Sequence, residues 1–215
     1  MEPVCNLAAR ISNFSHLATN PSHLRHGAAL YETHTVFPMA SHGSLLARFD
    51  AAEYRLCRRL NRGVENTGVR VFFKTASRLG DGVIWYALML ALPFIYGEQG
   101  LKVALVMLAT SAVGLAVYKF LKRTFVRERP FIRHAGISLA GAPLDRYSFP
   151  SGHTLHAVAF TWQGCTAFPE LSFVLVPLAL AIAASRVVLG LHYPTDVLVG
   201  ALLGATSGAI GASFI

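Results

Sequence analysis

Apolar residues along this chain gather into long blocks separated by short polar segments. Five blocks after residue 80 consist almost entirely of apolar and small residues. Several approach the roughly 20 residues that a helix needs to cross the hydrocarbon core of a bilayer. Glycines, prolines or a polar loop separate consecutive blocks. The pattern therefore predicts five membrane-spanning helices, at about 82–96, 101–121, 153–168, 171–191 and 195–215.

A different pattern precedes the first block. From residue 45 to 62, apolar positions recur at helical spacing while arginines occupy the other face, which is typical of a helix lying on a membrane surface. Residues 69–79 are weakly amphipathic and carry three basic residues, so we predict that they do not cross the bilayer. The alternative is a degenerate first spanning helix. Residues 1–43 contain no apolar core and are predicted to be a poorly ordered segment.

The chain is thus predicted to have an all-α fold, a multi-pass membrane helical bundle of about five spanning helices plus an N-terminal amphipathic interfacial helix. We assign residues 44–215 to one membrane-embedded domain, because the remaining segments are too short or too polar for a second core. The histidines of the N-terminal segment are irregularly spaced and have no carboxylate cluster nearby, so no metal site is expected there. They are His16, His23, His26, His34 and His42.

Composition and charge indicate a lipid partner. Apolar residues make up 53% of the chain, charged residues 14%, and the formal net charge is +8. The basic residues cluster at helix ends and in one loop rather than on a soluble face with interleaved aromatics, so nucleic acid is not the expected partner. Phosphate on a lipid, or an anionic membrane surface, fits better. The three cysteines lack metal-ligand spacing and are expected to be ordinary thiols.

One face of the predicted bundle collects the polar groups. An up-and-down path places the end of the second span, the start of the third, the end of the fourth and the start of the fifth at the same membrane face. Ionisable groups near a bilayer cost free energy, so such a cluster indicates a functional site. Its members are Lys122, Arg123, Arg127, Arg129, Arg133, Ser151, Gly152, His153, Arg186, His192 and Asp196.

Several of these residue types suit the binding of a phosphoryl group. Lys122, Arg129 and Arg186 supply cationic donors, and guanidinium forks match phosphoryl oxygens. Ser151 can cap a helix that starts at Gly152, and the free N–H groups of a helix start bind anions.

Two histidines complete the predicted chemistry. Pro194 favours an extended residue before it, which leaves His192 in a loop with Asp196 one turn into the last helix. Asp196 can accept from one imidazole nitrogen and leave the other free to attack phosphorus, while His153 can protonate the leaving oxygen. Taken singly, the cations could only snorkel to headgroups and the polar residues could only cap helices. One phosphoryl site accounts for all of them together.

This set of motifs resembles the three-part signature of the type 2 phosphatidic acid phosphatase superfamily, which also includes glucose-6-phosphatase and the vanadium haloperoxidases. The parts are Lys122 with Arg129-Pro130, then Pro150-Ser151-Gly152-His153, then Ser185-Arg186 with His192 and Asp196. The resemblance covers residues 78–215 and implies that His192 is a nucleophile forming a phosphohistidine, that Asp196 orients it, and that His153 is the general acid. It further implies phosphate binding by Lys122, Arg129, Ser151, Gly152 and Arg186, with no metal or other cofactor.

The predicted activity is hydrolysis of a phosphate monoester or diphosphate on a membrane lipid. Candidate substrates are undecaprenyl diphosphate, phosphatidylglycerol phosphate, phosphatidate and a polyprenyl-linked sugar phosphate. Phosphotransfer to another lipid by the same site, and lipid binding without catalysis, are the alternatives. Vanadium haloperoxidation is disfavoured, because it needs a site accessible from solution rather than a short multi-span bundle.

The membrane face of the site follows from the basic residues ahead of the first span. Lipid phosphatases of this superfamily commonly have six spans, whereas here an arginine-rich stretch at 45–79 replaces the expected first span. With five spans, the N-terminus and the site share a face, and the positive-inside rule then predicts a cytoplasmic site in a bacterial inner membrane. The basic residues counted are Arg48, Arg55, Arg58, Arg59, Arg62, Arg70, Lys74 and Arg78.

Overall fold

The computed structural model describes residues 45–143 and 145–215. The predictions made for residues 1–43, including the five histidines, lie outside the described residues. Within the described part, regular structure is helical apart from one isolated β-bridge between Glu128 and Tyr147. The predicted all-α membrane bundle is confirmed.

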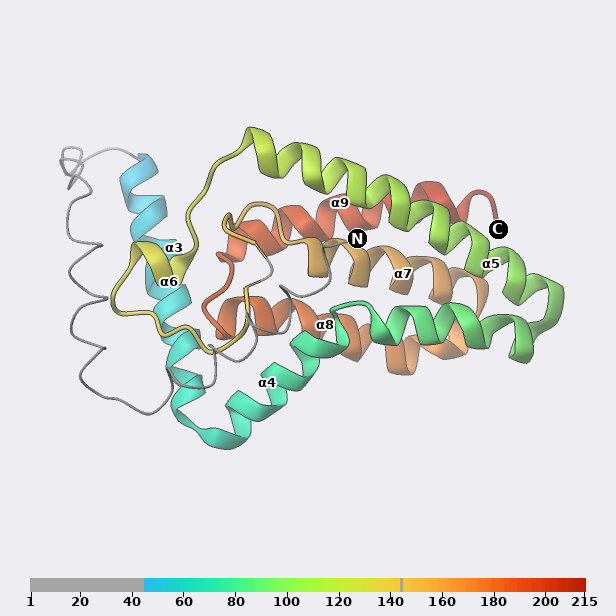
Figure 1. The fold of residues 1–215 in the computed structure, drawn as a ribbon, viewed down its shortest axis with the longest axis horizontal. Coiled ribbons are helices and arrows are strands. Elements are labelled where there is room, and N and C mark those ends of the chain that lie inside the picture. The colour runs from blue at the N-terminus through green and yellow to red at the C-terminus, as the bar shows by residue number, and fades with distance from the viewer. Residues whose placement is uncertain (1–44, 144) are drawn as a thin grey trace, which may run out of the picture. The chain divides into compact units, whose positions relative to one another are not determined.

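The helices follow one another along the chain with short connections, except for a long loop after α6 (Figure 1). Their bounds are α3 Leu45–Asn61, η2 Arg62–Glu65, α4 Thr67–Leu79, α5 Val83–Thr124, α6 Pro130–Arg133, α7 Gly152–Ala167, η3 Pro169–Leu171, α8 Ser172–Val188 and α9 Pro194–Ala212.

The long helix α5 is two helices joined at a sharp reversal. Gly97 interrupts it with φ 59° and ψ −134°, a conformation that L side chains rarely adopt. At Gly100 an added Cβ would lie 2.0 Å from the carbonyl oxygen of Leu92, so the two arms are in direct contact there. The predicted break between the first two apolar blocks therefore falls at the expected glycines, and the second arm runs back alongside the first (Figure 1).

Three described segments are long and apolar enough to cross a membrane, namely Val83–Thr124, Pro169–Val188 and Pro194–Ala212. The first of them contains two of the predicted spans. Helix α7 has 16 residues, or about 24 Å at the usual rise, and is shorter than a typical bilayer core of roughly 30 Å. The number of five spans stays a prediction.

Helix α7 lies at the centre of the bundle, where it packs closely on α9. Gly200, Gly204 and Gly208 face α7, and a Cβ added at these positions would lie 2.5, 2.4 and 2.9 Å from backbone oxygens of Ser151, Leu155 and Ala159. Small residues allow this close approach of two backbones. The glycine ladder therefore fixes the start of α9 against the start of α7, which positions the site described below.

The first described helix, α3, turns a polar face to the rest of the domain. Glu53, Cys57 and Asn61 are buried at helical spacing, and the Asn61 amide donates to the carbonyls of Ser138 and Val188, at 2.9 Å each. The apolar positions predicted to meet the membrane remain exposed: Leu45, Phe49, Leu56 and Leu60. Helix α4 has 13 residues and, at about 20 Å, is too short to cross a bilayer core by itself.

Candidate active site

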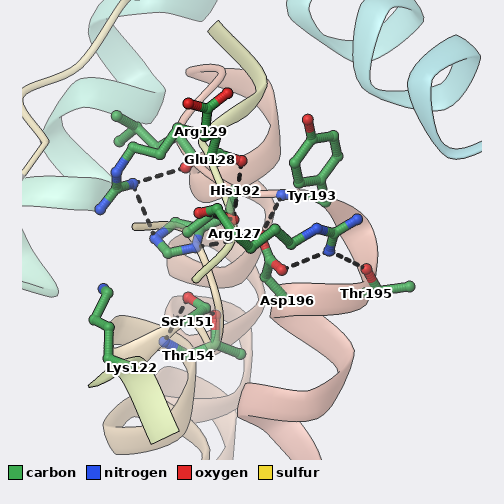
Figure 2. A network of polar contacts seen from close by, with 12 residues as sticks. Lys122, Arg127, Glu128, Arg129, Ser151, Thr154, His192, Tyr193, Thr195 and Asp196 are labelled. Carbon is green, nitrogen blue, oxygen red and sulfur yellow. Dashed lines mark hydrogen bonds and ion pairs between the residues drawn. The ribbon is translucent and has the colours of Figure 1, made fainter. Parts of the chain in front are cut away.

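The ends of four elements meet at one end of the bundle, as the up-and-down path predicts. The C-terminal end of α5, the N-terminus of α7, the C-terminus of α8 and the loop into α9 lie together there (Figure 1). Contacts between distant residues join them, including backbone N–H of Ser151 to the Asp196 carbonyl at 3.0 Å. Figure 2 shows the resulting polar network around His192.

His192 is buried in the α8–α9 loop with Arg129 beside it. Arg129 Nη1 lies 3.3 Å from His192 Nε2 and donates to the Leu191 carbonyl at 2.7 Å. A guanidinium has no acceptor, so Nε2 accepts and holds no hydrogen. Burial lowers the pKa of His192 to about 3; Asp196 opposes this shift, and the guanidiniums of Arg186 and Arg129 add to it. The ring is therefore neutral, and its Nε2 carries the unprotonated lone pair that a nucleophile requires.

Asp196 sits on the other side of the His192 ring, engaged mainly by other partners (Figure 2). Its Oδ2 accepts from the backbone N–H of Tyr193 at 2.8 Å and caps α9, and its Oδ1 accepts from Arg127 at 2.7 Å. His192 Nδ1 lies 3.8 Å from Oδ2, beyond hydrogen-bonding distance. Asp196 thus lies in the first turn of α9 as predicted, but the predicted hydrogen bond to the His192 ring is not made, and Nδ1 has no partner among the described residues.

The carboxylate of Asp145, from the loop before α7, lies between Lys122 and Arg129, two of the residues predicted to bind phosphate. It accepts from Lys122 at 2.6 Å and from Arg129 at 2.8 Å, and the Tyr118 hydroxyl also donates to it. Although burial opposes ionisation, hydrogen bonds from Lys122 and Tyr118 hold the pKa of Asp145 below its usual value. An anion therefore already bridges the donors that a phosphate would need.

Arg186, in the last turn of α8, is a buried cation that forms no ion pair with any of the described residues. Its exposed fraction is 1%. Its Nη1 donates to the Ser77 hydroxyl of α4 at 2.5 Å, while its Nε has no partner among the described residues. A buried charge of this kind is costly unless an opposite charge comes close. This environment indicates that Arg186 is suited to bind an anionic ligand.

The start of α7 is built as predicted. Ser151 is the N-cap and accepts from the backbone N–H of Thr154, and α7 begins at Gly152. A Cβ on Gly152 would lie 2.8 Å from the Tyr118 ring, so a larger residue would not fit. His153 follows in the first turn and contacts Asp81 at 2.6 Å. The structure thus supports the capping function of Ser151, but the amide of Ser151 is already used by Asp196.

Four charged residues outside the predicted set of catalytic and phosphate-binding residues take part in these contacts. Arg127 had been noted only as one of the basic residues, and no signal in the sequence marked the carboxylates of Glu53, Asp81 and Asp145. Arg127 bridges Asp196 to Glu53 of α3, at 2.7 and 2.5 Å, and Glu53 also accepts from the backbone N–H of Thr195 at 3.0 Å. Helix α3 is therefore connected through buried charges to Arg127 and to the start of α9, next to the loop that carries His192.

Replacing Asp145 with asparagine is expected to tighten the binding of a phosphate mimic. Without the carboxylate, Lys122 and Arg129 lose a competing anion that is held by charge-assisted hydrogen bonds, each worth about 1.5–3 kcal/mol. The inhibition constant of orthovanadate should then be at least about tenfold lower than for the wild type, since about 1.4 kcal/mol corresponds to a factor of ten. The inhibition constant in detergent measures this.

The matched control is Glu128→Gln, which removes the same charge from an exposed side chain between Lys122 and Arg129. Its inhibition constant should match that of the wild type. Weaker vanadate binding by Asp145→Asn would show instead that Asp145 organises the cations for the ligand.

Comparison with known proteins bears on this site. A family model described as the PAP2 superfamily matches residues 100–215. The chain is 35% identical over 149 residues to decaprenylphosphoryl-5-phosphoribose phosphatase from Mycobacterium tuberculosis, covering 68% of this chain and 81% of that protein. It is 32% identical over 117 residues to undecaprenyl-diphosphatase BcrC from Bacillus subtilis, covering 54% and 60%. Among solved structures, Aquifex aeolicus LpxE has a TM-score of 0.60 at 27% identity, covering 74% of this chain and 93% of that one.

The structure thus combines a helical membrane fold with a buried neutral histidine among several cations, an arrangement suited to a membrane phosphatase. The family model spans more than half of the chain and contains all of the predicted site residues. The chain therefore belongs to the PAP2 superfamily, and it is a membrane lipid phosphatase of the PAP2 type. The alternative of lipid binding without catalysis is thereby set aside.

Proposed function

We propose that this enzyme hydrolyses its lipid phosphate through a phosphohistidine on His192. Nε2 attacks phosphorus, the bond from phosphorus to the lipid oxygen breaks, and that oxygen takes a proton from His153. Water then attacks the phosphohistidine and gives a proton to His153, and the phosphorus–nitrogen bond breaks to release phosphate. Lys122, Arg129 and Arg186 hold the phosphoryl oxygens, with Ser151 and Gly152 at the helix start, and Asp196 stabilises the His192 ring.

One observation carries this mechanism. The nitrogen of His192 that accepts from Arg129 is an unprotonated nucleophile, and it lies among cations that a phosphoryl group would satisfy. Arg129 contacts both this nitrogen and the carboxylate that bridges to Lys122. A phosphate that replaced the carboxylate would therefore lie next to the attacking atom, where proximity favours reaction.

No metal takes part in the proposed mechanism, because a neutral histidine and three cations supply the nucleophile and the charge stabilisation. Phosphate release should therefore continue unchanged in excess chelator.

For the substrate, we propose a sugar phosphate monoester on a polyprenyl phosphate carrier. Support comes from the mycobacterial relative, whose name gives a decaprenylphosphoryl-5-phosphoribose as its substrate and of which this chain covers 81%. The test is phosphate release by the purified enzyme from that lipid, undecaprenyl diphosphate, phosphatidylglycerol phosphate and phosphatidate in matched mixed micelles. The expected result is the highest kcat/KM for the phosphoribose lipid. A higher kcat/KM for any of the others would reassign the substrate.

We place the active site on the cytoplasmic face of a bacterial inner membrane. The basic residues of α3 and α4 support this orientation under the positive-inside rule, since α3 is tied to the site through Glu53. With five spans, Ile215 would lie in the periplasm. A C-terminal alkaline phosphatase fusion, which is active only outside the cytoplasm, should then be active, and a C-terminal green fluorescent protein fusion should be dark. The reverse pattern would place the site outside.

A further inference from the structure

The turn between α4 and α5 places the carboxylate of Asp81 in contact with the start of α7. At Gly80 an added Cβ would lie 3.0 Å from Cδ2 of His153 and 2.9 Å from Cγ2 of Ile182. Gly82 has a φ of 123°, which favours glycine. Because glycines flank Asp81 on both sides, the turn can lie flat against α7. This turn precedes the residues that the family model matches, so it lies outside the three motifs.

The contact itself fixes the roles of the two imidazole nitrogens. Nε2 of His153 lies 2.6 Å from Oδ1 of Asp81. An ionised carboxylate only accepts, so Nε2 carries a hydrogen and donates it. Nδ1 makes no hydrogen bond to any of the described residues, and it is the nitrogen left for proton exchange with a ligand.

Asp81 and His153 also share a cavity of about 250 Å³. Its lining adds the apolar side chains of Trp85, Leu115 and Phe160 to these polar groups. A cavity with a polar pair and apolar walls suits the alcohol part of a lipid phosphate ester, which carries the oxygen that must be protonated.

We propose that Asp81 is a positioning residue that holds His153 with Nδ1 free to protonate the leaving oxygen. The proposal rests on the proposed function, since it assigns a partner to the general acid of that mechanism. In the first step Nδ1 gives its proton to the lipid oxygen as the phosphorus–oxygen bond breaks, and His153 becomes neutral while Nε2–H still donates to Asp81. In the second step Nδ1 takes a proton from the attacking water.

The charges around His153 explain why a carboxylate is needed. The charged and titratable groups that act on the ring are Asp81 from the turn, Arg186 from α8 and His156 from the next turn of α7. Burial of the ring, which is the largest effect, and the Arg186 guanidinium both oppose a positive charge on His153. The Asp81 carboxylate favours that charge, so it acts against both effects and supports the protonated ring that the leaving oxygen needs.

The test is Asp81→Asn assayed with two aryl esters that differ in their need for an acid, phenyl phosphate and 4-nitrophenyl phosphate. General acid catalysis contributes about 10²–10⁴-fold where the leaving group is poor. We expect kcat/KM to fall about 10²-fold with phenyl phosphate and less than about threefold with 4-nitrophenyl phosphate, whose anion leaves without a proton. An equal loss with both esters, or no loss with either, would overturn the role of Asp81.

A double-mutant cycle separates an effect through His153 from a structural one. Adding Asp81→Asn to His153→Asn should lower kcat/KM with phenyl phosphate by less than about twofold further, because residues acting as a unit are not additive. A full additional loss would contradict the proposal. Asp81→Glu, which keeps the charge, should recover part of the activity. Asp50→Asn, which removes an exposed carboxylate 4.0 Å from Arg133, serves as the matched control and should behave like the wild type.

The wild type tells the two proposals apart. If it releases phenol without a phosphohistidine that can be trapped, the proposed function fails. If it forms the phosphohistidine but Asp81→Asn shows no dependence on the leaving group, only the role of Asp81 fails.

Discussion

Replacing His192 with asparagine is expected to lower phosphate release by at least about 10³-fold, because the attacking nitrogen is lost and the cations alone retain only part of the catalysis. Asparagine is smaller than histidine and polar, so the buried loop should keep its fold. The phosphorylated intermediate should disappear as well. The measurement combines steady-state release from the lipid with rapid quenching at alkaline pH, where a phosphohistidine persists.

The control for this variant is His134→Asn. His134 packs against Tyr54 at the same end of the domain, with the two rings tilted and their centroids 4.3 Å apart, and makes no contact with His192 in the described network. Turnover by His134→Asn should remain within about twofold of the wild type, as for most substitutions away from a site. Undiminished turnover by His192→Asn would rule out the phosphohistidine mechanism.

Replacing Arg186 with methionine is expected to abolish activity and to stabilise the empty enzyme. The guanidinium is buried and has a hydroxyl, Ser77, as its partner rather than a carboxylate. Substituting apolar residues for buried charges is often neutral or stabilising by about 1–4 kcal/mol. Losing a cation that stabilises the transferring phosphoryl group should lower kcat/KM by at least about 10²-fold. Thermal unfolding in detergent and turnover of the same samples measure the two effects.

Arg127→Met is the matched contrast, because it is expected to lower the free energy of unfolding whereas Arg186→Met is expected to raise it. Arg127 is paired with both Glu53 and Asp196, whose side chains are 4% and 0% exposed. Removing Arg127 leaves two buried carboxylates without this cation, and breaking such a pair lowers the free energy of unfolding by about 3–5 kcal/mol. Orthovanadate should raise the melting temperature of the wild type and have no effect on Arg186→Met. A melting temperature for Arg186→Met clearly below that of the wild type would show that Arg186 is structural.

Arg127 occupies one of the two oxygens of Asp196 next to the loop that carries His192. From the chain alone, Asp196 was expected to hold the His192 ring directly. In the structure its two oxygens serve the Tyr193 amide and Arg127, and the tautomer of His192 follows from Arg129 instead. The reason is that a carboxylate at the first turn of a helix lies near backbone N–H groups and binds them.

Long-range contacts also changed the role of α3. Its arginines and exposed apolar residues predicted a surface helix, and the exposure of Leu45, Phe49 and Leu56 agrees with that position. Its buried face, however, carries Glu53. This carboxylate accepts a hydrogen bond from the backbone of Thr195, which lies 142 positions further along the chain. An acid on a basic helix gives no periodic signal, so the pattern of the chain could not reveal this contact.

The sequence by itself determined the helical membrane architecture, the end of the bundle where the chemistry collects and the three motifs of the site. Apolar block length, glycine positions and residue type depend on local physics, and a strict up-and-down path then leaves one choice of face. Only the tertiary structure decided which anion partners each cation has. Asp145, Glu53 and Asp81 come from loops and a helix with no motif of their own. Their positions follow from packing and from the need to neutralise buried charge, and both depend on residues far apart in the chain.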